Sequence, residues 1–331
     1  MRLTGFLIFV SGKVLKAVIL LAALSVLSFW LVSKSPIDPV QSYIGADAMV
    51  VGPEQRENIA AYWGLDRPPL ERLYSWGAAL LQGDFGTSMI FRRPVLTVIG
   101  ERFMASLMLM GLAWIISGLL GFWLGITAAM KQGSWLDRLI KTYCFTLAST
   151  PTFWLGLLLL IVFAVWLGWF PIGLAVPAGV LAEEVTLAER LRHLILPALT
   201  LSILGVANVA LHTRQKLIDV LNSEYVLLAR ARGATEREVL FRHGLRNIAL
   251  PAVTLQFASL SELFGGSVLA EQVFSYPGLG QATVQAGLRG DVPLLLGIVI
   301  FSAMFVFSGN LIADIIYRLV DPRIRQGEAS G

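Results

Sequence analysis

Charged side chains are scarce in this 331-residue chain: Asp, Glu, Lys and Arg make up 15% of it, whereas hydrophobic residues make up 56%. Soluble globular domains carry about 25% charged residues, so this chain has too few to cover an ordinary water-facing surface. Its mean hydropathy is +0.71, and its apolar residues are gathered into long runs. The composition therefore excludes an ordinary soluble domain and favours an all-α membrane protein.

Residues that carry metal or redox chemistry are equally few. The single cysteine, Cys144, excludes an intramolecular disulfide and a site with several thiolate ligands. The three histidines, His193, His212 and His243, lie in separate segments, whereas a metal site needs several converging ligands. We therefore expect neither a metal site nor a catalytic residue in this chain.

A nucleotide-binding loop of the form Gly-x-x-x-x-Gly-Lys-Ser/Thr is also missing, because the only Gly-Lys pair, Gly12-Lys13, is followed by Val14. We therefore expect the chain itself to bind no ATP or other cofactor. The formal net charge is +4 and the pI is 9.3. Its basic residues lie beside apolar runs, as membrane topology requires, so we expect no nucleic-acid partner.

Six apolar runs reach about 20 residues, the length that crosses a bilayer core. They are 14–32, 103–130, 142–170, 193–213, 250–274 and 293–320. Several are longer than the bilayer core requires, so we expect tilted helices or ends that protrude from the lipid. The sequence predicts six transmembrane helices in contact with membrane lipid.

Orientation follows from the Lys and Arg residues of the short connections, which accumulate on the cytoplasmic side. If the N-terminus is inside, the inner connections hold most of them: Lys131, Arg138, Lys141, Arg214, Lys216, Arg230, Arg232, Arg237, Arg242, Arg246, Arg318, Arg323 and Arg325. The short outer connections hold only Arg190, Arg192 and Arg289. We therefore predict that both termini are cytoplasmic.

The segment 34–100, between the first two runs, is long, nearly balanced in charge and punctuated by Pro and Gly. Long segments cross the membrane regardless of charge, and the punctuation predicts short helices and turns. We predict three parts: 1–33 with the first transmembrane helix, 34–100 as a periplasmic subdomain, and 101–331 as the core domain.

The polar segment 223–251, between the fourth and fifth runs, has the pattern of a helix, a break and a second helix. Gly233 is placed to end the first helix, where glycine adopts a positive φ at little cost. Thr235 and Glu238 have the spacing of a capping box at the start of the second helix. Val239, Leu240 and Leu245 can give that helix apolar contacts. We call residues 223–251 the elbow segment. We predict that it forms a rigid projection to which another protein binds.

The elbow segment closely resembles the EAA loop of ABC-importer permeases, in the version of the dipeptide/oligopeptide/nickel family: Glu-Tyr-Val-x-x-Ala-Arg-Ala-x-Gly, then His-x-x-Arg-Asn and Pro. The residues at the motif positions are Glu224, Ala229, Ala231, Gly233, His243, Arg246, Asn247 and Pro251. A merely basic connection does not require the glycine or the Arg-Asn-x-x-x-Pro ending.

Motifs outside the elbow segment extend the resemblance over essentially the whole chain. They include Asp66-Arg67-Pro68, Gly83-Asp84-Phe85-Gly86, Leu196-Pro197-Ala198, Pro277-Gly278 and Asp321-Pro322. One departure lies near Arg102, where the family usually has a proline and a threonine and this chain has Met104 and Ser106.

The resemblance implies a type I ABC-importer permease fold in the bacterial inner membrane, with a periplasmic insertion after the first helix. It implies four kinds of partner: a second homologous permease, two ABC ATPase subunits or domains that hold ATP and Mg, an extracytoplasmic substrate-binding protein, and lipid. It also implies that the elbow segment couples the ATPase to the transmembrane helices.

Acidic residues inside apolar runs are expensive to bury in a membrane and therefore point to function. Glu262 lies deepest in the fifth run, and Glu271 lies near its outer end. Either residue can face a translocation pathway, or can pair with a partner or with backbone groups. Gly265-Gly266 permits either close helix packing or a local break along that pathway.

Two questions stay open from the sequence. A proton-coupled carrier that uses Glu262 as its relay is an alternative mechanism, and it predicts transport without an ATPase. The cargo is a dipeptide, an oligopeptide, or nickel or a metal chelate, since similar permeases carry all of these.

Overall fold

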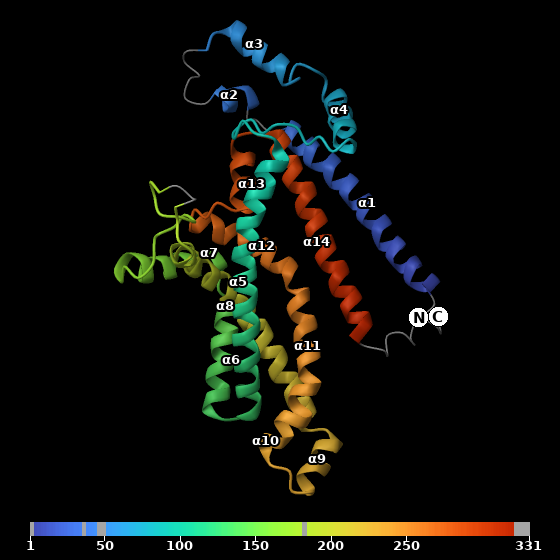
Figure 1. Ribbon diagram of the computed structural model, residues 1–331, viewed down its shortest axis with the longest axis vertical. Helices are drawn as coiled ribbons and strands as arrows, with labels where there is room; N and C mark the ends of the chain where they lie inside the picture. The colour runs from blue at the N-terminus through green and yellow to red at the C-terminus, as the bar shows by residue number, and fades with distance from the viewer. Residues whose placement is uncertain (1–2, 35–37, 45–50, 181–183, 321–331) are drawn as a thin grey trace. The chain divides into compact units, whose positions relative to one another are not determined.

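The computed structural model describes residues 3–34, 38–44, 51–180 and 184–320 (Figure 1). These residues form helices joined by turns and loops, which confirms the predicted all-α class. The predicted cytoplasmic C-terminal tail and the Asp321-Pro322 motif lie outside the described residues.

Four helices contain segments long and apolar enough to cross a membrane. They are α1 (Leu3–Ser33), α5 (Val95–Met130), α8 (Leu187–Leu221) and α14 (Val292–Val320). Two further pairs of helices, each bent at a short break, raise the number of candidate spans to six if each pair is counted as one. All six predicted runs therefore fall on long helices or bent helix pairs.

The third predicted run, 142–170, is not one continuous helix. α6 (Trp135–Ala148) ends before Pro151, and α7 (Thr152–Leu159) continues into the π-helix η2 (Leu160–Trp166). The two parts meet at an angle of 107°. Proline lacks an N–H donor and disfavours helical geometry at the residue before it, so Pro151 accounts for the break.

The fifth predicted run, 250–274, is also divided. α11 (Leu245–Ala258) and α12 (Leu260–Val273) meet at Ser259, with a bend of 48° between the two parts of this span. The Ser259 hydroxyl donates to the Gln256 carbonyl oxygen at 2.8 Å. Such local bonds compete with the helical ladder and bend helices.

The chain divides into two compact units, and α5 and α14 contribute to both. The first unit contains Met1–Ala105 and Gly278–Ser308. Its short helices are α2 (Pro39–Ile44), α3 (Pro53–Tyr62), α4 (Pro69–Leu81) and α13 (Leu279–Leu288). The first three confirm the short helices predicted for 34–100. The boundaries of the three predicted parts, and the periplasmic location of 34–100, stay predictions.

A buried carboxylate organises the first unit. Asp291 precedes α14, and its side chain accepts hydrogen bonds from the Ser88 hydroxyl at 2.5 Å and the Ile90 N–H at 3.0 Å. It also accepts from the Leu294 N–H at 3.1 Å. The carboxylate therefore caps α14, where a negative charge is favourable, and ties the loop after α4 to that helix.

The second unit contains Ser106–Pro277 and Gly309–Gly331, and α8 is packed against α6, α7, α11 and α12 within it. α5 approaches α8 through glycines. A Cβ atom at Gly121 would lie 2.7 Å from the Val209 Cβ, and one at Gly125 would lie 2.6 Å from the Ala210 carbonyl oxygen. The two backbones are therefore in direct contact, as is typical of helix pairs in membranes.

Candidate functional site

The elbow segment follows α8 as α9 (Glu224–Ala231), α10 (Glu236–Val239) and the π-helix η3 (Leu240–Gly244), which continues into α11. Figure 1 shows α9 and α10 together at one end of the second unit. Gly233 has a φ of +90°, so the predicted helix end with a left-handed glycine is confirmed.

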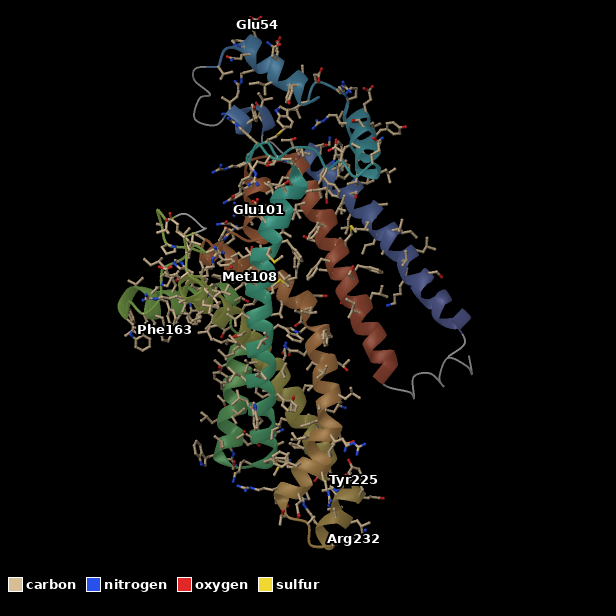
Figure 2. The ribbon with its side chains drawn as sticks, viewed as in Figure 1. Glu54, Glu101, Met108, Phe163, Tyr225 and Arg232 are labelled. Carbon is tan, nitrogen blue, oxygen red and sulfur yellow. The ribbon has the colours of Figure 1, made fainter. Side chains whose placement is uncertain are left out.

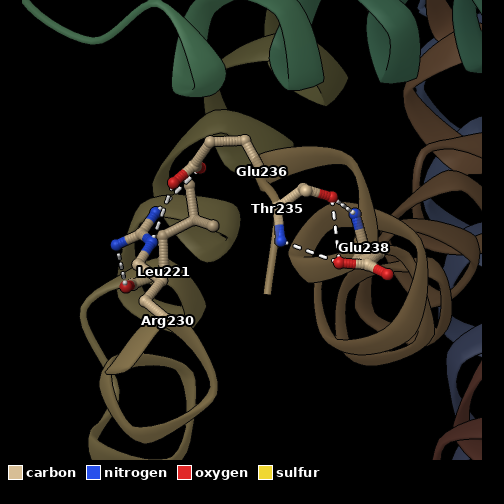
Figure 3. A network of polar contacts seen from close by, with 5 residues as sticks. All are labelled: Leu221, Arg230, Thr235, Glu236 and Glu238. Atoms are coloured by element: carbon tan, nitrogen blue, oxygen red, sulfur yellow. Dashed lines mark hydrogen bonds and ion pairs between the residues drawn. The ribbon is translucent and has the colours of Figure 1, made fainter. Parts of the chain in front are cut away.

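The predicted capping box is also present at the start of α10 (Figure 3). The Glu238 N–H donates to the Thr235 hydroxyl oxygen at 3.3 Å, and the Thr235 N–H donates to the Glu238 carboxylate at 2.8 Å. Two backbone donors that a helix start leaves unsatisfied are thereby paired.

An ion pair spans the break between the two short helices (Figure 3). The Arg230 guanidinium donates from Nε and Nη2 to the two carboxylate oxygens of Glu236, each at 3.0 Å. Arg230 also donates to the Leu221 carbonyl oxygen at 3.4 Å. Because both side chains of the pair are partly exposed, it is worth about 0–1 kcal/mol, and it joins α9 to α10 across the break.

Two valines anchor the elbow in the core of the second unit. Val226 of α9 and Val239 of α10 are completely buried, in one cluster with Leu217, Leu221 and Ile248. Leu240 and Leu245 pack against the same cluster, in agreement with the apolar contacts predicted for them. The elbow is thus joined to α8 and α11 by packing as well as by the chain.

The outer face of the elbow carries large apolar side chains. Tyr225, Leu228 and Phe241 are 46%, 52% and 66% exposed. Tyr225 and Leu228 line a cavity of about 430 Å³, whose charged lining residues are Arg232, Arg242 and Glu238. Figure 2 labels Tyr225 and Arg232 on this part of the chain. Exposed aromatic side chains together with arginines are enriched at protein interfaces.

The sequence-predicted residues are placed as follows. Ala229, Gly233 and His243 line the cavity, and the His243 ring lies 5.8 Å from the Tyr225 ring, between centroids. Glu224 is exposed on the first turn of α9, and Ala231 is exposed on its last turn. α9, the turn that follows it and η3 therefore bring three of the eight motif residues together.

The remaining motif residues lie on α11. Arg246 and Asn247 are exposed on its first turn, and the Asn247 side-chain amide donates to the His243 carbonyl oxygen at 2.6 Å. Pro251 lies inside the helix and is partly exposed. These residues position the junction between the elbow and α11 and do not line the cavity.

Sequence reasoning missed two structural features of this end of the unit. Phe241 is the more detectable one, because an aromatic residue within a strongly charged segment is itself a sign of an interaction surface. The other is the ion pair between Asp137 of α6 and Arg214 of α8. The two residues are 77 positions apart, and no local sequence pattern indicates that they meet.

A second candidate site is a groove around Glu262, with a volume of about 250 Å³. Glu262 is exposed along it, and Gly266 lines it. A Cβ atom at Gly266 would lie 3.0 Å from the Leu201 Cδ1, whereas one at Gly265 would meet no atom within 4 Å. Gly266 therefore has a packing role against α8, and Gly265 faces open space.

Glu271 has a different environment. Its side chain is completely buried, and its carboxylate accepts a hydrogen bond from the Ser106 hydroxyl at 2.6 Å. The serine that departs from the family pattern thus pairs with this carboxylate. Within the described residues, no group of three or more His, Cys, Asp or Glu side chains is arranged to hold a metal ion.

Comparisons with known sequences cover nearly the whole chain. A family profile described as "Binding-protein-dependent transport system inner membrane component" matches residues 121–326. The oligopeptide transport system permease protein AppB of Bacillus subtilis is 36% identical over 317 residues, which are 96% of this chain and 98% of the relative. The glutathione transport system permease protein GsiC of Escherichia coli K12 is 37% identical over 320 residues, with the same coverage.

Solved structures share the fold at lower identity. The inward-facing MetNI methionine ABC transporter matches with a TM-score of 0.56 and 16% identity, over 68% of this chain and 97% of the matched chain. An amino acid ABC transporter solved with histidines matches with a TM-score of 0.50 and 17% identity, over 67% and 94% of the two chains. At these identities the likeness is one of fold.

Proposed function

This chain belongs to the family of binding-protein-dependent transport system inner membrane components, and on this premise we propose that it forms half of the membrane pathway of a peptide importer. The chain is a multi-pass permease subunit of an ABC importer and not an enzyme. The chemical energy therefore comes from ATPase components, and no cofactor is assigned to this chain.

A peptide is the cargo that the relatives favour. The two relatives described above are named for oligopeptides and for glutathione, itself a small peptide. Nickel and metal chelates, the other cargo open from the sequence, have no counterpart in these two names. Nothing supports the proton-coupled alternative, because ATPase components already provide the energy for a member of this family.

The single observation that carries the mechanism is the construction of the elbow segment. Its two short helices are fixed to each other by Arg230 and Glu236 and fixed to the core by Val226 and Val239. Its outer face exposes Tyr225 and other apolar side chains. A rigid element with an apolar face is suited to dock in a groove of the partner ATPase.

Movement of the docked elbow would be transmitted directly to the transmembrane helices. α8 precedes α9 in the chain, and η3 continues into α11. ATP-driven closure of two ATPases would displace the elbow of this chain and that of a second, homologous permease. The displacement would open the pathway outward to receive cargo from an extracytoplasmic binding protein, and hydrolysis would reverse it. This scheme places both termini and the elbow in the cytoplasm and the segment 34–100 in the periplasm.

We propose that Glu262 and the neighbouring Gly265 face the translocation pathway. Glu271 and Gly266 have a structural role instead. Glu262 is exposed along a groove, whereas Glu271 is buried and hydrogen-bonded. Both residues lie on α12, outside the elbow segment, so their substitution should affect cargo passage and stability more than ATPase docking.

Cross-linking in the assembled importer tests the docking. Cys144 is completely buried, so an Ala231→Cys variant presents one accessible thiol on α9. We expect a short bifunctional reagent to join it to the ATPase subunit. Leu81→Cys, on the highly exposed end of α4, serves as the control and should give no such product. Cross-linking at Leu81→Cys but not at Ala231→Cys would refute the docking.

A further inference from the structure

Both breaks in the bent spans of the second unit border the same groove. Ala148 and Thr152, on either side of the break before Pro151, line it, and so does Ser259, the residue at the second break. Glu262 follows within the first turn of α12, and Asn208 faces the groove from the middle of α8. We call this the Glu262 groove.

Interrupted helices have a known physical meaning in a membrane. A broken backbone leaves carbonyl and N–H groups without their helical partners, and hydrocarbon cannot satisfy them. Such breaks are tolerated where they are buried in protein or line a cavity, and in secondary transporters broken helices form the substrate site. Two breaks that border one groove are therefore the reason to examine its side chains for contact with cargo.

The polar side chains of this groove are available for a ligand. Among the residues that the structure describes, the side chains of Glu262, Asn208 and Thr152 have no hydrogen-bond or ion-pair partner. The other acidic side chains of these helices differ. Glu271 accepts a bond from Ser106, and Asp137 is paired with Arg214. An ionisable side chain at membrane depth without a partner is costly unless a polar ligand or water reaches it.

The charge of the groove favours the amino terminus of a peptide over its carboxyl terminus. Its charged lining residue is a carboxylate, and no Lys, Arg or His is among the described residues that line it. A protonated amine has three donors and a positive charge, and it suits a carboxylate with nearby amide and hydroxyl oxygens. A peptide carboxylate would be repelled by the same side chain.

We propose that the Glu262 groove binds the protonated amino terminus of the peptide during its passage, with Glu262 as the counter-charge and the oxygens of Asn208 and Thr152 as further acceptors. This inference rests on the proposed function, because it requires a peptide cargo. One charge-assisted contact gives a weak site, which allows the cargo to leave again. The groove adds a preference for a free amine to the selection made by the binding protein.

The test uses the complete importer in liposomes: both permeases, the ATPases and the binding protein. ATP-driven uptake is measured for trialanine and for N-acetyl-trialanine, at concentrations that occupy the binding protein equally. In the Glu262→Gln variant, trialanine uptake should fall about tenfold, as expected for the loss of one charged hydrogen bond, while uptake of the acetylated peptide should change less than about twofold. Glu262→Asp should restore most of the trialanine uptake, because it retains the charge.

Each variant is compared with the wild type for the same peptide and the same binding protein, so the preference of the binding protein cancels in the variant-to-wild-type ratio. Glu271→Gln, on the same helix, is the matched control and should change both peptides by one common factor. An equal loss of both peptides in Glu262→Gln, or no loss of either, would overturn the proposal while leaving the proposed function intact. Absence of ATP-driven trialanine uptake in the wild-type importer would reject the peptide cargo, and the inference with it.

Discussion

The carboxylate of Asp137 accepts two hydrogen bonds from the guanidinium of Arg214, at 2.7 and 2.8 Å, and a third from the Gly133 N–H at 2.9 Å. The Asp137 side chain is 1% exposed and that of Arg214 is 14% exposed. Arg214 lies about two turns before the end of α8. The pair therefore links the start of α6, a helix whose other end borders the Glu262 groove, to the part of α8 that carries the elbow.

Removing Arg214 should destabilise the permease strongly. Arg214→Ala leaves the Asp137 carboxylate buried beside only Gly133 and the more distant Lys141, at 3.9 Å, and breaking a buried pair in this way costs about 3–5 kcal/mol. The thermal midpoint of the purified importer measures the effect. Arg138→Ala, at an exposed neighbouring position, is the control and should cost less than about 0.5 kcal/mol. Equal shifts in both variants would contradict a structural role for the pair.

Gly233 should tolerate residues in the order of their ability to adopt a positive φ. At +90° we expect transport to decrease from Gly through Asn and Ala to Val, because left-handed geometry costs about 1–2 kcal/mol in L-residues other than Asn. No atom lies within 4 Å of a Cβ at this position, so the series reports backbone conformation and not crowding. ATP-driven uptake measures transport, and ATPase activity stimulated by loaded binding protein measures the coupling. A Val variant with normal coupling and normal membrane insertion would refute the role of the bend.

Glycines of α5 should differ sharply in their tolerance of a side chain. Gly125→Val places a Cβ 2.6 Å from the Ala210 carbonyl oxygen and 2.7 Å from the Thr213 Cβ, and overpacking of this kind costs about 1–3 kcal/mol or more. Gly111→Val on the same helix is the matched control, since no atom lies within 4 Å of its Cβ position. The yield of monodisperse protein in detergent should fall only for Gly125→Val. Equal yields would mean that α5 and α8 do not pack this closely.

The capping box should control the local stability of α10. Thr235→Ala removes the hydroxyl that accepts from the Glu238 N–H and should cost about 1 kcal/mol. Hydrogen exchange of the amides in 236–240 should accelerate by about fivefold as a result, whereas Thr235→Ser should keep the wild-type rate. Uniform acceleration throughout the second unit would instead indicate global destabilisation.

The features predicted correctly from the sequence are those set by neighbouring residues. The elbow follows from Gly233, Thr235 and Glu238, which act over a few positions, and four of the spans follow from unbroken apolar runs. The break at Pro151 had a local cause too, but the long apolar run around it gave the stronger pattern. The break at Ser259 is accompanied only by a hydrogen bond from the Ser259 hydroxyl to the Gln256 carbonyl oxygen, which the sequence does not predict.

Interactions between distant residues had no such local origin. Ser106 meets Glu271 across 165 positions, and Asp137 meets Arg214 across 77. Both carboxylates lie in or beside apolar runs, so the sequence shows that each needs a partner. It does not show which helix provides that partner, because this depends on how α5, α6, α8 and α12 pack. The exposed position of Glu262 is a product of the same packing.

The anchoring of the elbow has a consequence for the affinity of the assembled complex. Helices as short as α9 and α10 are unstable alone in water, yet here the core residues Val226 and Val239 order them before any partner arrives. Association with an ATPase then requires no loss of backbone entropy on this side of the interface, a loss of about 1–2 kcal/mol for each residue ordered. A small contact surface can therefore keep the permease bound to the ATPase through repeated transport cycles, in which the two proteins move together.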